Sequence, residues 1–287
     1  MPIEVFRVLE PGVGATIQDR GRAGWRRFGV PPSGAMDDHA AGWANRLLHN
    51  PPRAPVLELL MQGARLEALC NTWIVVAGAD ASATVPLWKN VRVRAGEIIE
   101  FPRNQAGLWI YLAVEGGFAA ATWLGSASAY PRGNLGKALQ RGDVLSRNTK
   151  VVFQLPASVA GCAVAWDERR TYDQPPPLHV WPGPQWNLFE PRERAAFFDQ
   201  EWTVSAQSDR VGYRLEGTPL KLPPTQIISE PVCVGTIQVP ASGLPIVTMR
   251  DGPTVGGYFK LGVLAPTEFS WLAQCRPGRK IRFAMQA

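Results

Sequence analysis

The chain has 287 residues, of which 46% are hydrophobic and 19% are charged, and a formal net charge of +6. This length and composition can fill a core of one large β-rich domain or two modest domains, which excludes a globally disordered chain. The basic residues are interleaved with acids, and no basic run, helix-turn-helix or RNA-binding strand pattern is present, which argues against nucleic-acid binding. An anionic small molecule or an acidic partner accounts for the charge equally well.

The sequence shows no motif typical of a targeting segment or of a metal site. The stretch MPIEVFRVLEPG has no basic region followed by an apolar run, and no segment approaches 18 uninterrupted apolar residues, so we expect no signal peptide and no membrane span. The four cysteines are far apart, with no C-x-x-C, and the three histidines are scattered. We therefore expect reduced thiols, no metal site and a cytoplasmic protein.

In the first part of the chain, apolar runs predict strands with one helix among them. Strands are expected at 3–9 and 56–61, and an apolar stripe over 37–50 predicts an amphipathic helix between them. Asp37 or Asp38 can cap the start of that helix, and Asn50-Pro51-Pro52 ends it. Further strands are predicted at 73–80, 91–101, 108–118 and 150–155.

Glu58 interrupts the apolar strand at 56–61. Alternation commonly places such a residue on the solvent face, and a buried Glu58 is expected to need an arginine partner.

In the second part, strands again dominate after a charged and proline-rich boundary region at 167–180. Strands are predicted at 178–183, 201–205, 237–243, 244–249, 257–264 and 280–285, and short helices at 190–198 and 266–274. Because strict βαβ alternation is missing, a parallel doubly wound sheet is disfavoured, and we predict a mainly antiparallel β protein built as barrels with a few short helices.

A weak internal repeat predicts two related halves. Asp19-Arg20 followed by Gly24-Trp25-Arg26 matches Asp209-Arg210 followed by Gly212-Tyr213-Arg214. The run VPPSG at 30–34 likewise matches VPASG at 239–243. We expect halves at 1–172 and 173–287, whose strands can interleave.

The segment TIQDRGRAGWRRFGVPPSGAMDD at 16–38 is rich in arginine and glycine. Glycines let the backbone approach a ligand closely, and arginine forks bind a carboxylate or phosphate through two hydrogen bonds. Asp19 can orient such a fork towards an anion. The alternative is a surface loop with solvated arginines.

Two second-half segments also concentrate polar residues. In SDRVGYRLEG at 208–217, Arg210 and Arg214 flank Tyr213, which predicts either an anion clamp or a hairpin whose arginines pair with Asp209 and Glu216. The segment 229–262 places acids, an amide, Thr-Val-Gly-Gly, a tyrosine and a lysine among apolar strands. Such residues either form an internal network or line a cleft, so Lys260 is either a base or counter-ion, or a solvated strand-edge lysine.

Several stretches together resemble one known family. QDRGRAGWRRFGVPPSGAMD, ANRLLHNPPRAPVLEL, LAVEGGF with LGSAS, DRVGYRLEG, SEPVCVGTIQVPASGLPIV, DGPTVGGYFK and LAQCRPGRKIRF occur in this order. They resemble the biotin-dependent carboxyltransferase family, which includes allophanate hydrolase subunit 2, the C-type subunit of 5-oxoprolinase and the KipA type. The resemblance covers nearly the whole chain and implies two cyclophilin-like β-barrel halves.

The resemblance implies a C-type subunit of an ATP-dependent 5-oxoprolinase, active in complex with a B-type (KipI-like) partner and an A-type partner. Its alternatives are a carboxyltransferase component that acts on urea or a related amide, and a non-catalytic KipA-like regulator that binds a KipI-like partner. ATP or carboxybiotin would come from the partner chains, since this chain has no Walker A, dinucleotide fingerprint or biotin-attachment sequence.

The expected site residues fall in the motifs that match. As catalytic residues we expect Lys260, Tyr258 and Asp251. The expected substrate-binding residues are Gln18, Asp19, Arg20, Arg22, Ser33, Arg210, Tyr213, Arg214, Glu230, Gln238, Thr254, Gly256 and Gly257. The chain departs from the family pattern at Pro253, Phe259 and Ala129, in expected site loops, which leaves the substrate open.

Overall fold

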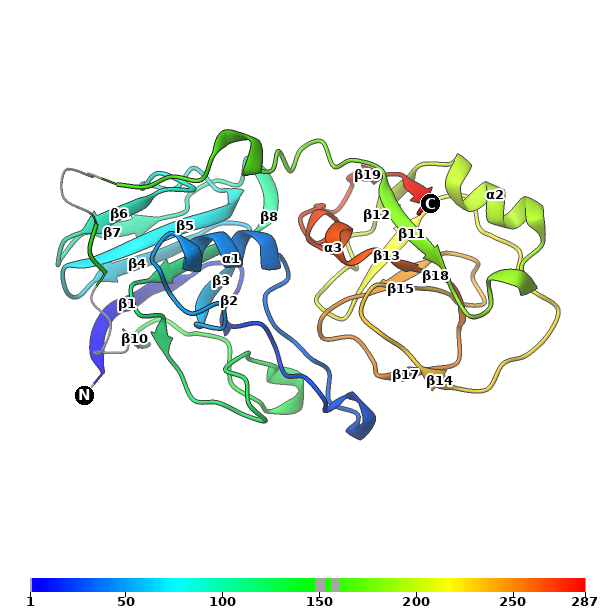
Figure 1. The fold of residues 1–287 in the computed structure, drawn as a ribbon, viewed down its shortest axis with the longest axis horizontal. Helices are drawn as coiled ribbons and strands as arrows, with labels where there is room; N and C mark the ends of the chain where they lie inside the picture. Colours follow the sequence, from blue (N-terminus) through cyan, green and yellow to red (C-terminus); the bar gives the residue numbers. More distant parts are fainter. Residues whose placement is uncertain (1, 148–152, 156–160, 287) are drawn as a thin grey trace. The chain divides into compact units, whose positions relative to one another are not determined.

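The computed structural model describes residues 2–147, 153–155 and 161–286, and the chain forms two compact units (Figure 1). Unit 1 consists of Met1–Arg22 and Ser33–Asp173, and unit 2 of Ala23–Pro32 and Gln174–Ala287. The arginine-rich loop is therefore divided, because its middle segment belongs to unit 2 and its two ends to unit 1. No helix in the described part of the chain is long and apolar enough to cross a bilayer.

Unit 1 contains two five-stranded antiparallel sheets, ordered β7-β4-β1-β10-β9 and β2-β3-β8-β5-β6. The strands of the first are β1 (Ile3–Pro11), β4 (Ala64–Ala68), β7 (Ile98–Glu100), β9 (Phe118–Ala119) and β10 (Val144–Arg147). The strands of the second are β2 (Ala15–Gln18), β3 (Val56–Leu60), β5 (Thr72–Asp80), β6 (Asn90–Val93) and β8 (Ala106–Val114). Unit 1 also has the 3₁₀ turns η2 (Pro131–Gly133) and η3 (Trp166–Glu168).

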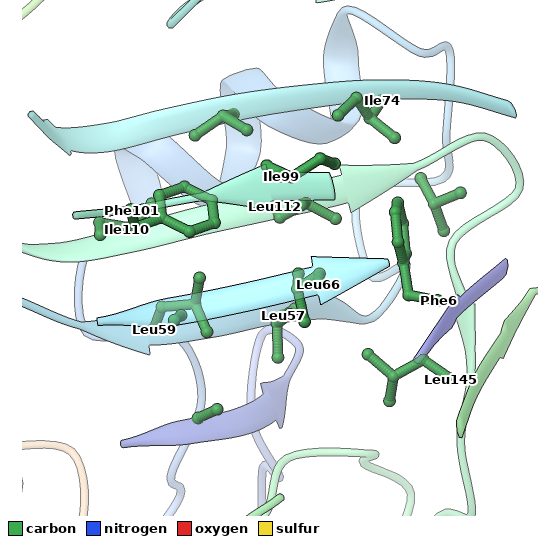
Figure 2. Packing of buried hydrophobic residues seen from close by; sticks show 14 of the residues in the cluster. Phe6, Leu57, Leu59, Leu66, Ile74, Ile99, Phe101, Ile110, Leu112 and Leu145 are labelled. Carbon is green, nitrogen blue, oxygen red and sulfur yellow. The ribbon is translucent and has the colours of Figure 1, made fainter. Parts of the chain in front are cut away.

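The core of unit 1 is apolar and draws on both sheets. Figure 2 shows Phe6 and Leu66 from one sheet, and Phe101 directly after β7, packed with Leu57 and Leu112 from the other sheet. All five are at most 1% exposed. Burial of each such side chain stabilises the fold by roughly 1.5–3 kcal/mol before entropy is counted, so this core holds the sheets that carry the site loops.

Helix α1 (Asp38–Arg46) packs on β5 and β8. Asp37 caps it as predicted, since its carboxylate accepts a hydrogen bond from the backbone N–H of Ala40 at 3.0 Å. The helix ends earlier than its apolar stripe suggested, and turns lead on to Asn50. With α1 on one face and the core on the other, the central strands are buried on both sides, which explains their unbroken apolar runs.

Unit 2 is organised around an eight-stranded sheet, ordered β19-β12-β13-β16-β15-β18-β11-β20. Its strands are β11 (Leu178–Pro182), β12 (Trp202–Val204), β13 (Gly212–Glu216), β15 (Thr236–Val239), β16 (Ile246–Thr248), β18 (Phe259–Leu264), β19 (Lys280–Ile281) and β20 (Phe283–Met285). The first and last strands of this order are separated in the sequence by Arg282 alone. Chain connectivity thus brings the two edges together, and the sheet is a nearly closed barrel.

The remaining elements of unit 2 surround this barrel. They are the two-stranded ribbon β14 (Glu230–Pro231) with β17 (Val255–Gly256), the helices α2 (Pro191–Asp199) and α3 (Pro266–Ala273), and the turns η1 (Arg26–Phe28) and η4 (Trp186–Leu188). Phe197 of α2 stacks on Phe283 at 4.8 Å between ring centroids and contacts Trp202 at 5.8 Å. These aromatic contacts hold α2 against the barrel.

The predicted fold class is confirmed, because the described chain is mainly β and its named strands pair antiparallel apart from β11 with β20. The short helices at 190–198 and 266–274 are also confirmed. The predicted strand at 150–155 is not seen at 153–155, which have no regular structure, and its first three residues lie outside the described residues. Sequence patterns missed β2, β4 and β10, which are short or interrupted by charged residues.

Candidate functional site

The carboxylate of Asp19 anchors the first half of the arginine-rich loop. It accepts hydrogen bonds from the hydroxyls of Ser126 and Ser128, both at 2.6 Å, and from the backbone N–H groups of Gly21 at 2.7 Å and Ala127 at 2.8 Å. Burial by itself would raise the pKa of Asp19, but these hydrogen bonds outweigh it and hold the pKa below its usual value. Asp19 is therefore an ionised anchor that ties the loop after β2 to residues 126–128.

The other predicted residues of this half lie around that anchor in unit 1. Arg22 is 1% exposed and donates to the carbonyl oxygen of Ser128, while Gln18 donates to the carbonyl oxygen of Ala129 at 3.1 Å. Ser33 is buried, and its hydroxyl has no hydrogen-bond partner among the described residues. Arg20, by contrast, is exposed and lines a pocket. The structure thus gives Arg22 a loop-holding contact and leaves Arg20 as the arginine of this pair that can meet a ligand.

Glu58 is buried, at 1% exposed, and the expectation that it faces solvent is wrong. Its Oε2 accepts hydrogen bonds from the phenol of Tyr111 and the backbone N–H of Met36, both at 2.8 Å. Tyr111 can reach this carboxylate because β3 pairs with β8 so that Glu58 lies opposite Tyr111.

Tyr111 links Glu58 to the cap of α1. Its phenol oxygen accepts from the backbone N–H of Asp37 at 2.7 Å, and the Asp37 carboxylate accepts from Tyr172 at 2.6 Å. Burial, with added repulsion from Glu58 and Asp37, raises the pKa of Tyr111 well above its ordinary value. Tyr111 therefore remains a protonated phenol, and this network fixes residues 33–38 against the sheet.

In unit 2, Arg210 and Asp251 form a two-point ion pair. The Arg210 Nε lies 2.7 Å from Asp251 Oδ2, its Nη2 lies 3.4 Å from Oδ1, and the Asp251 backbone N–H donates to the Arg210 carbonyl at 2.8 Å. Asp209, which the hairpin alternative predicts as an arginine partner, also accepts a hydrogen bond from the backbone N–H of Val211 at 2.8 Å. Arg210 and Asp251 thus join two loops of the barrel.

Tyr213 and Arg214 lie on β13 and face in different directions. Tyr213 is 1% exposed and donates from its phenol to the carbonyl of Ala273 at 2.7 Å, whereas Arg214 is exposed. Tyr213 therefore connects the barrel to the end of α3, and Arg214 is the residue of this pair that solvent reaches.

Lys260 forms the centre of a second polar cluster. It lies on β18 with its side chain 3% exposed, and its Nζ is 3.5 Å from Oε2 of Glu230. Among the described residues, Nζ has no hydrogen-bond partner. Gln185 joins the two residues, because its Nε2 donates to Glu230 Oε1 at 2.7 Å and its Oε1 accepts from the Lys260 backbone N–H at 3.1 Å. A buried ammonium with one loosely placed counter-charge has donor capacity left for a ligand.

The ribbon β14–β17 and strand β15 complete this cluster. Gln238 lies opposite Lys260 in the β15–β18 register and donates to the hydroxyl of Thr248 at 2.9 Å. A Cβ at Gly256 would lie 2.9 Å from Oε1 of Gln238, so only glycine leaves this amide its present position. The structure therefore brings together Lys260, Glu230, Gln238 and Gly256.

The remaining predicted residues flank strand β17 in the sequence. A Cβ at Gly257 would contact Ser229 at 3.3 Å, Thr254 is half-buried, and Tyr258 is 49% exposed. Phe259, one of the departures from the family pattern, is buried and contacts Phe189 edge-on with 5.9 Å between ring centroids. It thus fills core space next to Lys260.

Several members of these clusters were not predicted. Ser126 and Ser128 lie in a Gly- and Ser-rich run whose alternating serines are the signal that could have marked them. Gln185 follows a Pro-Gly-Pro turn after a strand, and such turns are common places for binding residues. Tyr111 lies in an apolar strand, and nothing in the neighbouring sequence distinguishes it from an ordinary core residue.

The cysteines are unpaired, with Cys275 buried and Cys233 exposed. Burial raises the pKa of the Cys275 thiol to about 12. Among residues 2–147, 153–155 and 161–286, no group of three or more His, Cys, Asp or Glu side chains is placed to hold a metal ion.

The arrangement is that of a carboxyltransferase domain. The model of the family "Carboxyltransferase domain, subdomain A and B" matches residues 28–285, and the chain belongs to this family. It is 33% identical to the C-type subunit of 5-oxoprolinase from Haemophilus influenzae, over 96% of this chain and 89% of the relative. It is 31% identical to the C-type subunit of 5-oxoprolinase from Escherichia coli, over 97% of this chain and 90% of the relative.

Solved structures have the same fold. The crystal structure of the Kluyveromyces lactis urea carboxylase is 29% identical to this chain with a TM-score of 0.89, over 100% of this chain and 28% of that one. The chain thus spans little more than a quarter of that protein, and about half of another matching structure.

Proposed function

We propose that this chain is the C-type subunit of an ATP-dependent 5-oxoprolinase and acts with A-type and B-type (KipI-like) partners. The observation that carries the proposal is its similarity to two proteins named as this component of 5-oxoprolinase, which extends over 96–97% of this chain and 89–90% of theirs. The reaction adds water across the lactam of 5-oxo-L-proline, breaks the ring C–N bond and releases glutamate, and ATP hydrolysis supplies the driving force.

Lys260 is the residue to which we assign the central role. As the lactam carbonyl carbon becomes tetrahedral, negative charge develops on its oxygen, and a buried ammonium stabilises such charge more strongly than a solvated one. The Nζ of Lys260 is buried and its counter-charge stands 3.5 Å away, so it can donate to that oxygen. Glu230 balances the ammonium when no substrate is bound.

Arginine supplies the complementary binding role. The substrate 5-oxo-L-proline carries one carboxylate, and an exposed arginine fork binds a carboxylate through two hydrogen bonds. Arg214 is the exposed predicted arginine of unit 2, which also contains Lys260, and we assign carboxylate binding to it.

The test is glutamate formation from 5-oxo-L-proline and ATP by this chain together with its A-type and B-type partners. We expect turnover to require this chain and to be lost in Lys260→Met. The matched control is Lys280→Met, because Lys280 is an exposed lysine that also pairs with a glutamate, Glu201, at 3.2 Å. Full turnover without this chain, or equal turnover in both variants, would overturn the proposal.

A second function is supported by the family match and by the similarity to urea carboxylase over the full length of this chain. In this case the chain transfers a carboxyl group from carboxybiotin, carried by another chain, to urea or a related amide. The same purified complex, supplied with carboxybiotin and urea, separates the two functions, because carboxylated urea would form without ATP-dependent release of glutamate.

A further inference from the structure

A pocket of about 500 Å³ lies along α1 in unit 1. This volume is in the range of small-molecule sites. Its wall includes Arg20, His39, Gly42, Trp43, Arg46 and His49. His39, Gly42, Trp43 and Arg46 follow the three- and four-residue spacing that places side chains on one face of a helix, so the pocket uses an entire face of α1.

The pocket wall is cationic. It contains two arginines and two histidines, and the described residues that line it include no aspartate or glutamate. The guanidinium carbon of Arg46 lies 4.6 Å from the centre of the Trp43 ring, so the two side chains stack. Arg20 follows Asp19, whose carboxylate is held at four points. The backbone before Arg20 is thus fixed, and both guanidinium groups suit a carboxylate or phosphate.

Gly42 is the feature that intramolecular packing does not explain. It lies in the middle of α1, where glycine is less favourable than alanine. A Cβ at Gly42 would meet no heavy atom within 4 Å, so alanine would fit the helix without a clash. The absence of a side chain there keeps the pocket open above the helix backbone.

Two amide side chains that line the pocket, Asn45 and Asn50, are held by hydrogen bonds within the protein. Asn45 donates to the carbonyl oxygen of Ala54 at 2.9 Å, and Asn50 donates to the side chain of Asn45 at 3.0 Å and to the carbonyl oxygen of Val114 at 2.9 Å. Because these amides are engaged in fixing the chain, the arginines supply the donors for a bound anion.

We propose that this pocket is a binding site for a small anion that carries a carboxylate or phosphate group. The anionic group lies between Arg20 and Arg46, and the body of the ligand lies over Gly42. The site is a property of this chain alone and needs neither partner chains nor turnover.

The test is isothermal titration calorimetry of the purified full chain, with 5-oxo-L-proline in one arm and inorganic phosphate in the other. We expect at least one arm to show binding that weakens as salt is raised. The arm that binds identifies whether the carboxylate or the phosphate is the ligand group. Gly42→Phe fills the pocket and Arg46→Gln removes a charged donor, and each is expected to weaken binding by about tenfold or more.

Two controls separate binding from folding. Arg194→Gln removes the same kind of stacked arginine, since the Arg194 guanidinium carbon lies 5.2 Å from the Trp186 ring centre in unit 2, and it should leave binding unchanged. Gly42→Ala should raise the melting temperature because alanine favours the helix, while it weakens binding less than Gly42→Phe does.

The proposal is overturned if neither probe binds at concentrations up to about 10 mM, which corresponds to under roughly 3 kcal/mol of binding free energy. It is also overturned if Gly42→Phe binds as the unchanged protein does, or if Arg194→Gln weakens binding as much as Arg46→Gln. Because turnover is not measured, this result and the test of 5-oxoprolinase activity are independent.

Discussion

The Nζ of Lys260 lies 3.5 Å from Oε2 of Glu230, and the lysine is buried while the carboxylate is about a third exposed. The distance is longer than a direct hydrogen bond, so the pair balances charge without saturating the ammonium. A buried charge that retains donor capacity is costly unless a ligand uses it.

Substitution of Glu230 and substitution of Lys260 should therefore change the free energy of unfolding by different amounts. Glu230→Gln leaves the buried ammonium without its counter-charge and should lower the free energy of unfolding by about 1–3 kcal/mol. Lys260→Met replaces the ammonium with an apolar chain and should cost less or stabilise the protein, while it abolishes activity. Urea unfolding at neutral pH measures both, and a larger loss for Lys260→Met than for Glu230→Gln would contradict this account.

Gln185 should act as a positioning residue, because it holds the Glu230 carboxylate at 2.7 Å and the Lys260 backbone at 3.1 Å. Gln185→Leu should lower the free energy of unfolding by about 1–3 kcal/mol and should also lower kcat. Gln200→Leu is the matched control, since Gln200 accepts from the Thr218 backbone N–H at 2.8 Å and donates to the Ala196 carbonyl at 3.2 Å, away from the cluster. The control should lose stability but retain kcat. Equal kcat in both variants would show that the role of Gln185 is only structural.

Gly256→Ala should disturb the cluster around Lys260 because the added methyl group is too close to its neighbours, without any change in charge. The new Cβ would lie 2.9 Å from Oε1 of Gln238 and 3.1 Å from Cγ2 of Val232. Gln238 must then move, and we expect loss of activity with a lowered melting temperature. Gly14→Ala is the comparison, because its Cβ would meet Leu60 at an ordinary 3.7 Å. Similar behaviour of the two alanine variants would rule out the close-contact explanation.

The contribution of Asp19 to stability should depend on acid pH. Its folded-state pKa is below the ordinary value, so its stabilising contribution is present above about pH 4 and is lost as the pH falls through the folded-state pKa. Asp19→Asn should therefore be less stable than the unchanged protein at pH 7, and the difference should shrink below about pH 4. Urea unfolding from pH 3 to 7 measures it. A difference that stays constant with pH would mean that the carboxylate charge is not what holds the loop.

The spacing of apolar residues and the positions of capping residues and prolines predict much of the fold. The apolar spacing of 37–50 and the cap at Asp37 predicted α1, and Pro191 and Pro266 mark the first turns of α2 and α3. These features depend on neighbours along the chain. Alternation favours a solvent-facing Glu58, but the residue is buried because its environment depends on β8 across the sheet, where Tyr111 supplies a donor that no local pattern reveals.

Periodicity along the chain predicts the β architecture and the short helices, and the order of the motifs predicts the family, because both are properties of the chain. Which of the polar residues work together depends on the tertiary structure. Arg20 and Arg22 stand two positions apart, yet one lines a pocket and the other is buried against the Ser128 carbonyl. Lys260, Glu230 and Gln185 come from three distant segments and meet because the barrel brings β18, β14 and the turn after β11 together. Burial and partner geometry depend on contacts between distant segments, which spacing along the chain does not encode.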